Sequence, residues 1–256
     1  MQAASRRLKI FDILQKQKTV EVKDLAQEFN VSTMTIRRDL ARLENEGVLS
    51  THYGGATLNE GVSSEPSFSI KSGYSQKHKE QIAHQAYLLI EEGDCIYLDC
   101  GTTALELAKL LSNKRITLLT NSWKVLSVVH DFSKIEVILA PGSYDPISEG
   151  TISAATIDYF NNFLVDKAFV STQGVDLDYG VSVPNAQDAQ VKKSILKISK
   201  QKILLADHTK FGQTYFANHG KLEDFDAIIV DANLDINVEK QMRARKLNLF
   251  IAKNNK

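Results

Sequence analysis

Hydroxyl and guanidinium groups are concentrated in residues 32–42, where their spacing fits a helix with two different faces. The apolar face recurs at i, i+4 and i+7 and consists of Ile36, Leu40 and Leu43. The opposite face carries Met34, Thr35, Arg38, Ala41 and Arg42, with Arg37 on its flank. Ser32 stands where the N-cap is expected, because its hydroxyl can accept from the first free N–H groups. Such a helix after a tight turn is typical of segments that enter the DNA major groove, so we expect DNA contacts from Ser32, Thr33, Thr35, Arg37, Arg38 and Arg42.

A second group of ligand-binding candidates follows a strand-like run that ends at Leu98. The chain continues as Asp99-Cys100-Gly101-Thr102-Thr103 and passes directly into a helical pattern. Gly101 lets the backbone approach a ligand closely, the threonines offer hydroxyls, and the helix N-terminus offers free N–H groups. These features predict an anion cradle suited to phosphate, with Asp99 at its start.

Two further polar clusters follow strand-like runs. One is Thr120-Asn121-Ser122, and the other is residues 206–212, in which Lys210 supplies an ammonium group that can complete the cradle. Taken singly, each loop fits an ordinary strand-to-helix turn equally well. Three such loops at strand ends together favour a small anionic ligand.

Two amphipathic helical patterns precede the recognition helix. Their apolar stripes are Ile10, Ile13 and Leu14 in the first, and Val22, Leu25, Ala26 and Phe29 in the second. Asn30 suits the left-handed conformation of a sharp turn, and Gly47 suits the position just after a helix. Residues 48–51 and 53–56 then predict two short strands around a glycine turn. The pattern indicates a winged helix-turn-helix, with a plain three-helix bundle whose surface arginines are solvated as the alternative.

The rest of the chain alternates short apolar runs with helical patterns. The expected strands are residues 95–98, 116–119, 135–140, 167–170, 203–205 and 227–230, and the expected helices include residues 104–111, 123–130, 154–160 and 189–199. This alternation predicts an α/β domain whose mainly parallel sheet is covered on both faces. Ligands bind beyond the carboxyl ends of strands in such sheets.

The domain boundary is expected in a polar stretch that contains the helix-hostile step Glu65-Pro66. We therefore predict a DNA-binding domain at residues 1–57, a linker at residues 58–75 and an effector domain at residues 76–256.

Composition restricts the possible locations and partners. Lysine plus arginine equals aspartate plus glutamate, at 31 each, so no global positive field attracts the chain to DNA. Residues 1–57 carry nine Lys or Arg against seven Asp or Glu, a net charge of +2, so specific binding must depend on individually placed contacts. The two cysteines form neither a disulfide framework nor a metal cluster. The sequence has no signal-peptide pattern and no long apolar run, which predicts a cytoplasmic protein without membrane contact.

The N-terminal pattern resembles the signature of the DeoR family of bacterial transcriptional regulators. The matching residues are Arg6, Ile10, Leu14, Ser32, Thr35, Ile36, Arg37, Arg38, Asp39 and Leu40. The second half resembles the sensor domain of the same family at residues 99–103, 120–122, 166–169 and 207–212. The resemblance spans nearly the whole chain and implies a sensor fold similar to ribose-5-phosphate isomerase and the CoA transferases. It also implies a phosphorylated sugar as inducer, a place for Gly142 near the sugar, and an even-numbered homo-oligomer (dimer or tetramer).

Three functions remain to be weighed. The first is a repressor of a sugar-metabolism operon that leaves its double-stranded DNA operator when a phosphorylated sugar binds. The second is a sugar-phosphate isomerase-like enzyme with an appended DNA-binding domain, in which Asp99, Asp207 and Lys210 would have to supply acid–base groups. The third is a constitutive DNA-binding protein whose second domain serves only for oligomerisation. We favour the first, with no catalytic residue, cofactor or metal, because none of the acids is clearly placed as a base and the ligand loops argue against the third.

Overall fold

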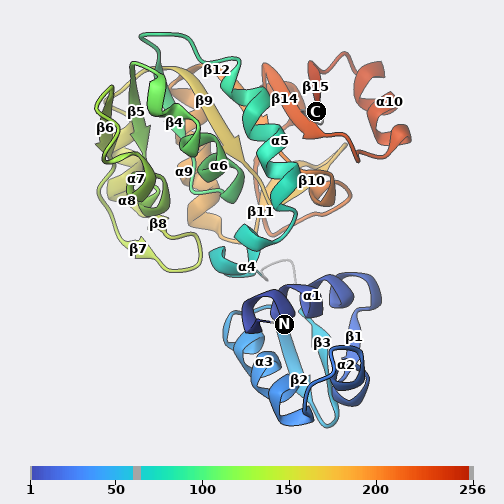
Figure 1. Ribbon diagram of the computed structural model, residues 1–256. Helices are drawn as coiled ribbons and strands as arrows, with labels where there is room; N and C mark the ends of the chain where they lie inside the picture. The colour runs from blue at the N-terminus through green and yellow to red at the C-terminus, as the bar shows by residue number, and fades with distance from the viewer. Residues whose placement is uncertain (1, 60–64, 254–256) are drawn as a thin grey trace. The chain divides into compact units, whose positions relative to one another are not determined.

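The computed structural model describes residues 2–59 and 65–253 and divides into two compact units, residues 1–74 and 75–256 (Figure 1). The predicted linker, residues 58–75, includes residues 60–64, which lie outside the described residues. Its remaining residues include the end of one strand and a short helix.

The first unit packs helices against a small antiparallel sheet. Its elements are α1 (Ala3–Gln17), β1 (Thr19–Glu21), α2 (Val22–Glu28), α3 (Thr33–Asn45), β2 (Leu49–His52), β3 (Gly55–Leu58) and α4 (Phe68–Gly73). The predicted apolar stripes meet in one core that includes Ile10, Leu14, Leu25, Ile36, Leu40 and Leu43. The sheet order is β1-β3-β2, so a strand that the sequence did not predict, β1, joins the wing. The winged helix-turn-helix is thereby confirmed.

Helix α4 belongs to the core of the first unit. Ile70 is buried in the same cluster as the side chains of α1–α3. The ring of Tyr74 meets the ring of Phe11 edge-on, with centroids 5.2 Å apart. A Cβ atom at Gly73 would lie 2.6 Å from Leu8 Cδ1, so α4 and α1 pack closely at this position. Much of the polar segment after the wing is therefore anchored to the first unit.

The second unit is built on a parallel sheet, which in the described residues has seven strands in the order β15-β14-β12-β9-β4-β5-β6. The strands are β4 (Cys95–Leu98), β5 (Ile116–Thr120), β6 (Ile135–Leu139), β9 (Val165–Ser171), β12 (Ser199–Leu205), β14 (Ala227–Asp231) and β15 (Leu249–Ala252). All neighbouring pairs are parallel, so the carboxyl ends of the strands lie at one edge. The predicted α/β class is confirmed.

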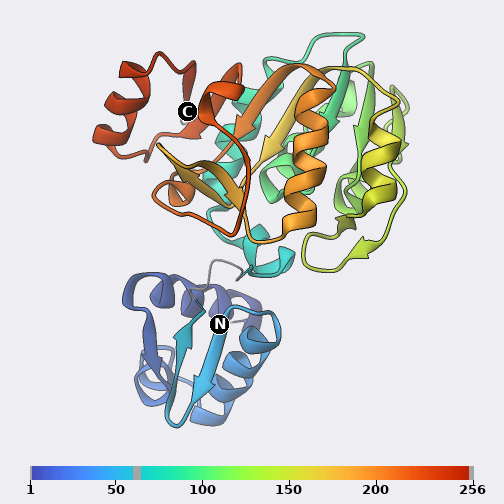
Figure 2. The same cartoon turned by 180° about the vertical axis from the view of Figure 1, so that it is seen from behind.

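Helices cover both faces of this sheet, as Figures 1 and 2 show from opposite sides. One face is covered by α5 (Gln76–Tyr87), α6 (Thr102–Lys109) and α7 (Trp123–Val129), whose apolar side chains share a buried cluster. The other face is covered by α8 (Ala154–Phe160), α9 (Ala186–Lys197) and α10 (Ile236–Ala244). The starts of two expected elements differ most: α9 begins three residues earlier than predicted, and β12 begins at Ser199, a residue that was expected to end the preceding helix.

Short elements complete the second unit. They are η1 (Leu111–Asn113), β7 (Tyr144–Asp145), β8 (Gly150–Thr151), β10 (Gly174–Asp176), β11 (Gly180–Val183), η2 (His208–Lys210), β13 (Ala217–Gly220) and η3 (Leu222–Asp224). Strands β10, β11 and β13 form a small antiparallel sheet, and β7 pairs with β8. Among the residues that the structure describes, no helix is both long and apolar enough to cross a membrane.

Candidate functional site

The turn into α3 has the geometry that its residue types predict. Asn30 adopts a left-handed conformation with φ 51°. Ser32 is the N-cap, and its side-chain oxygen accepts a hydrogen bond from the Thr35 backbone nitrogen at 3.2 Å. The two hydroxyls lie 2.9 Å apart, so Ser32 and Thr35 also bond to each other. Thr33 is exposed at the first position of the helix. These bonds fix the start of α3, where its side chains would first meet a DNA groove.

The outer face of α3 is exposed and cationic. Arg37 and Arg38 are exposed, while Ile36, Leu40 and Leu43 are buried on the opposite side. Arg42 is also exposed, and its Nε donates to Glu46 Oε1 at 2.8 Å, one helical turn along. Glu46 therefore partly neutralises Arg42. Arg37 and Arg38 are the stronger candidates for binding a phosphate or a guanine edge.

Asp39, next to these arginines, has a different role from its neighbours. It is buried, and its Oδ2 accepts a hydrogen bond from Arg6 Nε at 2.5 Å. Arg7 Nη1 lies 3.8 Å from the other carboxylate oxygen. Asp39 is therefore not part of a solvated ion-pair face with the neighbouring arginines. A buried ion pair joins α3 to α1 and holds in place the helix that carries Arg37 and Arg38.

The wing is fastened to α3 at its base. The Thr51 backbone nitrogen and hydroxyl donate to Glu44 Oε1 at 2.7 and 2.9 Å. These bonds, the backbone bond first, lower the pKa of Glu44 and keep it ionised. At the tip, Tyr53 is fully exposed and Gly54 takes φ +93°, which favours glycine. The wing thus presents an exposed aromatic side chain at its tip.

In the second unit, the strand order reverses between β4 and β9. The chain runs outward from β4 through β5 to β6, then returns to β9 and runs outward the other way through β12. Parallel sheets form a ligand-binding crevice where such a reversal occurs, at the carboxyl ends of the two strands. We call the junction of β4 and β9 the seam. Asp99, which the sequence predicted as a site residue, follows β4 at the seam. Ser171, which the sequence did not predict, ends β9 at the same place.

A buried network of charges joins the two sides of the seam at Asp99. Asp99 Oδ2 accepts hydrogen bonds from Lys192 Nζ at 2.5 Å, Ser171 Oγ at 2.6 Å and the Ser171 backbone nitrogen at 2.9 Å. Asp99 Oδ1 accepts from the Cys100 backbone nitrogen at 2.8 Å. Burial alone would raise the pKa of Asp99, but Lys192 and the Ser171 donors outweigh it, so the pKa is lowered. Asp99 is therefore an ionised residue that organises the seam.

Lys192 is the main functional candidate that the sequence interpretation missed. It is buried on α9, and Asp188 lies one turn earlier with an oxygen 3.6 Å from its Nζ. Burial lowers the pKa of this ammonium group, but Asp188 and Asp99 outweigh burial and raise the pKa. The available signal was spacing: Asp188, Lys192 and Ile195 share one helical face, so two charged residues interrupt a core stripe.

Gly101 is required by packing within the protein. A Cβ atom at this position would collide with the Ser171 hydroxyl. Gly101 is also the N-cap of α6 and, as a glycine, has no side chain with which to cap that helix. Thr102 and Thr103 are buried in the first helical turn. The predicted combination of glycine, threonines and a helix N-terminus thus lies at the seam, beside Ser171.

The cluster Thr120-Asn121-Ser122 is occupied by bonds within the protein. Thr120 Oγ1 donates to the Leu98 carbonyl oxygen at 2.7 Å, and Ser122 Oγ caps α7 by accepting from the Val125 nitrogen at 3.2 Å. Asn121 Oδ1 accepts from Tyr97 at 2.7 Å, and its Nδ2 donates to the Thr151 carbonyl oxygen at 2.8 Å. These residues hold the ends of β4 and β5 in place, and this role accounts for their residue types.

The remaining predicted ligand residues lie on either side of the seam. Gly142 follows β6 at φ +147°, and a Cβ atom there would collide with the Thr156 hydroxyl at the start of α8. Lys210 is half-buried in η2, and its Nζ donates to Gln173 Oε1 at 3.3 Å. Gln173 follows the end of β9, so Lys210 reaches from the β12 loop toward the seam. Gly142 lies on the far side of β5, at the end of β6.

A buried histidine adjoins the same network. The Nε2 atom of His219 lies 3.1 Å from the Thr172 hydroxyl. Burial first, and then the nearby Lys192, lower the pKa of His219 to about 3. His219 is therefore neutral at physiological pH, and the sequence offered no pattern that predicts this position.

Two family models match the chain. The DeoR-like helix-turn-helix domain matches residues 6–62, and the DeoR C terminal sensor domain matches residues 75–232. The chain is 32% identical to the HTH-type transcriptional regulator YgbI of Escherichia coli K12, over 97% of this chain and 98% of that protein. It is 28% identical to the glycerol-3-phosphate regulon repressor of the same organism, over 97% and 99%. Among solved structures, ribose 5-phosphate isomerase A of Methanocaldococcus jannaschii has 16% identity and a TM-score of 0.40, covering 53% of this chain and 54% of that chain.

Proposed function

The chain belongs to the DeoR family of helix-turn-helix transcriptional regulators, and on this premise we propose that it represses a sugar-metabolism operon and is released by a phosphorylated sugar. The observation that carries the ligand class is the seam, where Gly101, the start of α6 and Lys210 converge on one sheet edge. A helix N-terminus and an ammonium group both favour a phosphate. The relative named as the glycerol-3-phosphate regulon repressor supports the same class of effector.

We assign the operator contacts to Arg37 and Arg38, supported by Ser32, Thr33, Thr35 and Arg42. Residues 1–57 are the proposed DNA-binding domain and residues 76–256 the effector domain, in a cytoplasmic homo-oligomer. Two copies of α3 related by a two-fold axis would match a palindromic operator.

The effector contacts are assigned in two groups. Gly101, Thr102, Thr103 and Lys210 are the proposed phosphate contacts. Asp99, Thr120, Asn121, Ser122 and Gly142 hold or shape the strand ends around them, as their internal bonds and close packing indicate.

The charge state of the seam argues against isomerase activity. An isomerase of this type needs a carboxylate whose pKa is raised enough to act as a base. Burial opposes ionisation of Asp99, but Lys192 lowers its pKa; burial likewise opposes ionisation of Asp207, whose pKa Lys210 and Thr209 lower. Both acids are committed to hydrogen bonds within the chain.

We expect a phosphorylated sugar to raise the melting temperature of the full-length protein. At a ligand concentration of 100 Kd, binding to the native state alone contributes about 2.7 kcal/mol, or roughly 5–10 °C for a unit of this size. The measurement is a thermal-shift series with pentose and hexose phosphates. Each phosphate is paired with its unphosphorylated sugar, which should have little effect. Equal stabilisation by both members of every pair, or turnover of the phosphate detected by chromatography, would reject this assignment.

Lys210→Ala should separate sensing from DNA binding. A hydrogen bond from an ammonium group to phosphate contributes about 1.5–3 kcal/mol, so the variant should bind the effector more weakly by that amount. A ligand shifts an equilibrium only by its differential affinity, so this variant should remain on the operator at effector levels that release the wild type. Operator release is measured by fluorescence anisotropy of labelled promoter DNA.

Lys200→Ala is the matched control. Lys200 lies near the start of β12, whereas Lys210 follows the end of that strand, at the opposite edge of the sheet. It should respond to effector like the wild type. Loss of operator binding by a folded Lys210→Ala protein would place Lys210 in the core or in an interface, and the effector site would have to lie elsewhere.

A further inference from the structure

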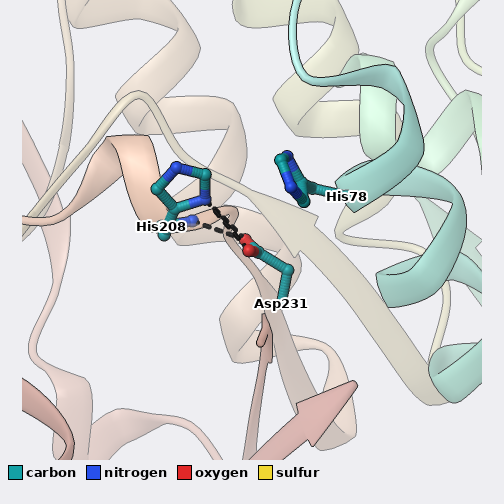
Figure 3. Close-up of side chains that lie close together, drawn as sticks. All are labelled: His78, His208 and Asp231. Atoms are coloured by element: carbon teal, nitrogen blue, oxygen red, sulfur yellow. Dashed lines mark hydrogen bonds and ion pairs between the residues drawn. The ribbon is translucent and has the colours of Figure 1, made fainter. Parts of the chain in front are cut away.

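Two histidines and an aspartate converge at the carboxyl edge of the sheet in the second unit (Figure 3). His78 comes from α5, His208 from η2 after β12, and Asp231 from the end of β14. One ligand atom from each of the three side chains lies within 4.8 Å of the other two. Three segments that are far apart in sequence therefore bring two imidazoles and a carboxylate together.

Asp231 is the fixed member of this cluster. It is fully buried, and its oxygens accept hydrogen bonds from the backbone nitrogens of His208 at 2.7 Å and Asn233 at 3.0 Å. The Nδ1 atom of His208 lies 3.0 and 3.1 Å from the two carboxylate oxygens. The backbone thus holds the carboxylate in place and directs it toward the imidazole of His208, as the dashed lines in Figure 3 show.

His78 provides the observation that points to a ligand. Its ring stands edge-on to that of His208, with centroids 4.9 Å apart. Its Nε2 lies 2.9 Å from Asn233 Nδ2. Its Nδ1 is buried and has no hydrogen-bond partner among residues 2–59 and 65–253. A buried polar atom without a partner costs free energy, and coordination of a metal would remove that cost.

We propose that His78, His208 and Asp231 bind a divalent transition-metal ion, for which Zn²⁺ is the probe. Two imidazoles and a carboxylate are ligands that Zn²⁺ accepts, at about 2.0–2.2 Å from each atom. Tetrahedral ligands at that distance lie about 3.4 Å apart, so the imidazoles close on the ion by roughly 1 Å through side-chain rotation. The fourth position remains open for water or another ligand.

Binding needs neutral imidazoles and an ionised carboxylate. If Nδ1 of His208 binds the ion, its proton moves to Nε2, and the hydrogen bond to Asp231 is replaced by shared coordination. The ion would then join α5 to the ends of β12 and β14. This inference goes beyond the proposed function, since it requires neither DNA nor a sugar phosphate.

The test uses the full-length protein without a polyhistidine tag, stripped with chelator and titrated with Zn²⁺ by isothermal calorimetry. We expect one ion per chain and, with Co²⁺ in its place, the visible absorption of a four-coordinate site. His78→Gln should weaken Zn²⁺ binding by about 100-fold or more, since even outer-shell changes cost 10–100-fold. His84→Gln is the matched control, because His84 is exposed on the same helix.

The melting temperature and circular dichroism spectrum of each metal-free variant show that it is folded. His208→Gln is a second variant that removes another ligand and should give the same loss. Stoichiometric binding that survives in His84→Gln and is lost in the two ligand variants supports the site. Absence of stoichiometric Zn²⁺ binding in the wild type, or equal binding by His78→Gln and His84→Gln, overturns it.

Discussion

Replacing Lys192 with methionine should lower the free energy of unfolding of the second unit by about 3–5 kcal/mol, the usual cost of removing one partner of a buried ion pair. The variant leaves Asp99 buried and ionised, with Ser171 and the Cys100 nitrogen as its remaining donors. The free energy is measured by urea denaturation with Trp123 fluorescence, because Trp123 is the only tryptophan in the sequence and lies on α7 of the same unit.

The control for Lys192→Met is Lys200→Met, which breaks an ion pair with Asp166 on the surface. The two side chains of that pair are 60% and 36% exposed, so water replaces the lost contact and the effect should be much smaller. Asp99→Asn added to Lys192→Met should restore part of the loss, since it removes the unpaired charge. Equal urea midpoints for Lys192→Met and Lys200→Met would show that the buried pair does not hold the seam together.

The buried pair of Asp99 and Lys192 also makes the free energy of unfolding depend on pH. The pKa of Asp99 is lowered in the folded state, so its contribution is present above the ordinary value of 3.8 and is lost as pH falls through the folded value. The pKa of Lys192 is raised, so its contribution is present below 10.5 and is lost as pH rises through the folded value. In Lys192→Met the pKa of Asp99 should rise, and acid unfolding should begin at a higher pH than in the wild type.

Replacing both Arg37 and Arg38 with alanine should nearly abolish operator binding. Each arginine that bonds a guanine edge contributes about 1–3 kcal/mol, so the double variant should lose roughly 2–6 kcal/mol if both read bases. If either arginine contacts phosphate instead, the slope of the logarithm of affinity against the logarithm of salt concentration should become shallower by about 1 per lost contact. Fluorescence anisotropy at several salt concentrations distinguishes the two cases.

Arg243→Ala is the charge-matched control for the arginine pair. Arg243 is exposed on α10 of the second unit and is paired with Glu239. It should leave operator affinity unchanged. If the folded double variant binds the promoter as tightly as the wild type, α3 is not the recognition helix.

Residues with local roles could be predicted from the sequence. Ser32 caps α3, Asn30 turns with a positive φ, and Gly47 follows the helix with φ +73°, all as their residue types indicate. The six expected strands of the large sheet are also present, because apolar runs bounded by polar turns need no knowledge of distant neighbours. The small sheet of β10, β11 and β13 was missed, since short strands with polar residues such as Asn218 and His219 lack an alternating pattern. Strand β15 was also missed, although Leu249–Ala252 is an apolar run like the six that were predicted.

Roles that depend on tertiary contacts could not be predicted in the same way. Asp39 and Lys192 look like surface residues until Arg6 and Asp99, 33 and 93 residues away in the chain, are placed beside them. Asn121 has the composition expected of a ligand contact, but its amide is bonded to Tyr97 and to the Thr151 carbonyl. A polar side chain at a strand end therefore has a structural partner or a ligand, and only the fold distinguishes them.

The seam between β4 and β9 also has a consequence for folding kinetics. Each half of the sheet is assembled from strands that are close in sequence, whereas Asp99 meets Ser171 across 72 residues and Lys192 across 93. Long loops must close before such contacts form, so we expect the halves to assemble early and the seam to close late. Interactions made after the rate-limiting barrier slow unfolding and leave the folding rate nearly unchanged. We therefore expect a ligand bound across the seam to lengthen the lifetime of the folded second unit without hastening its formation.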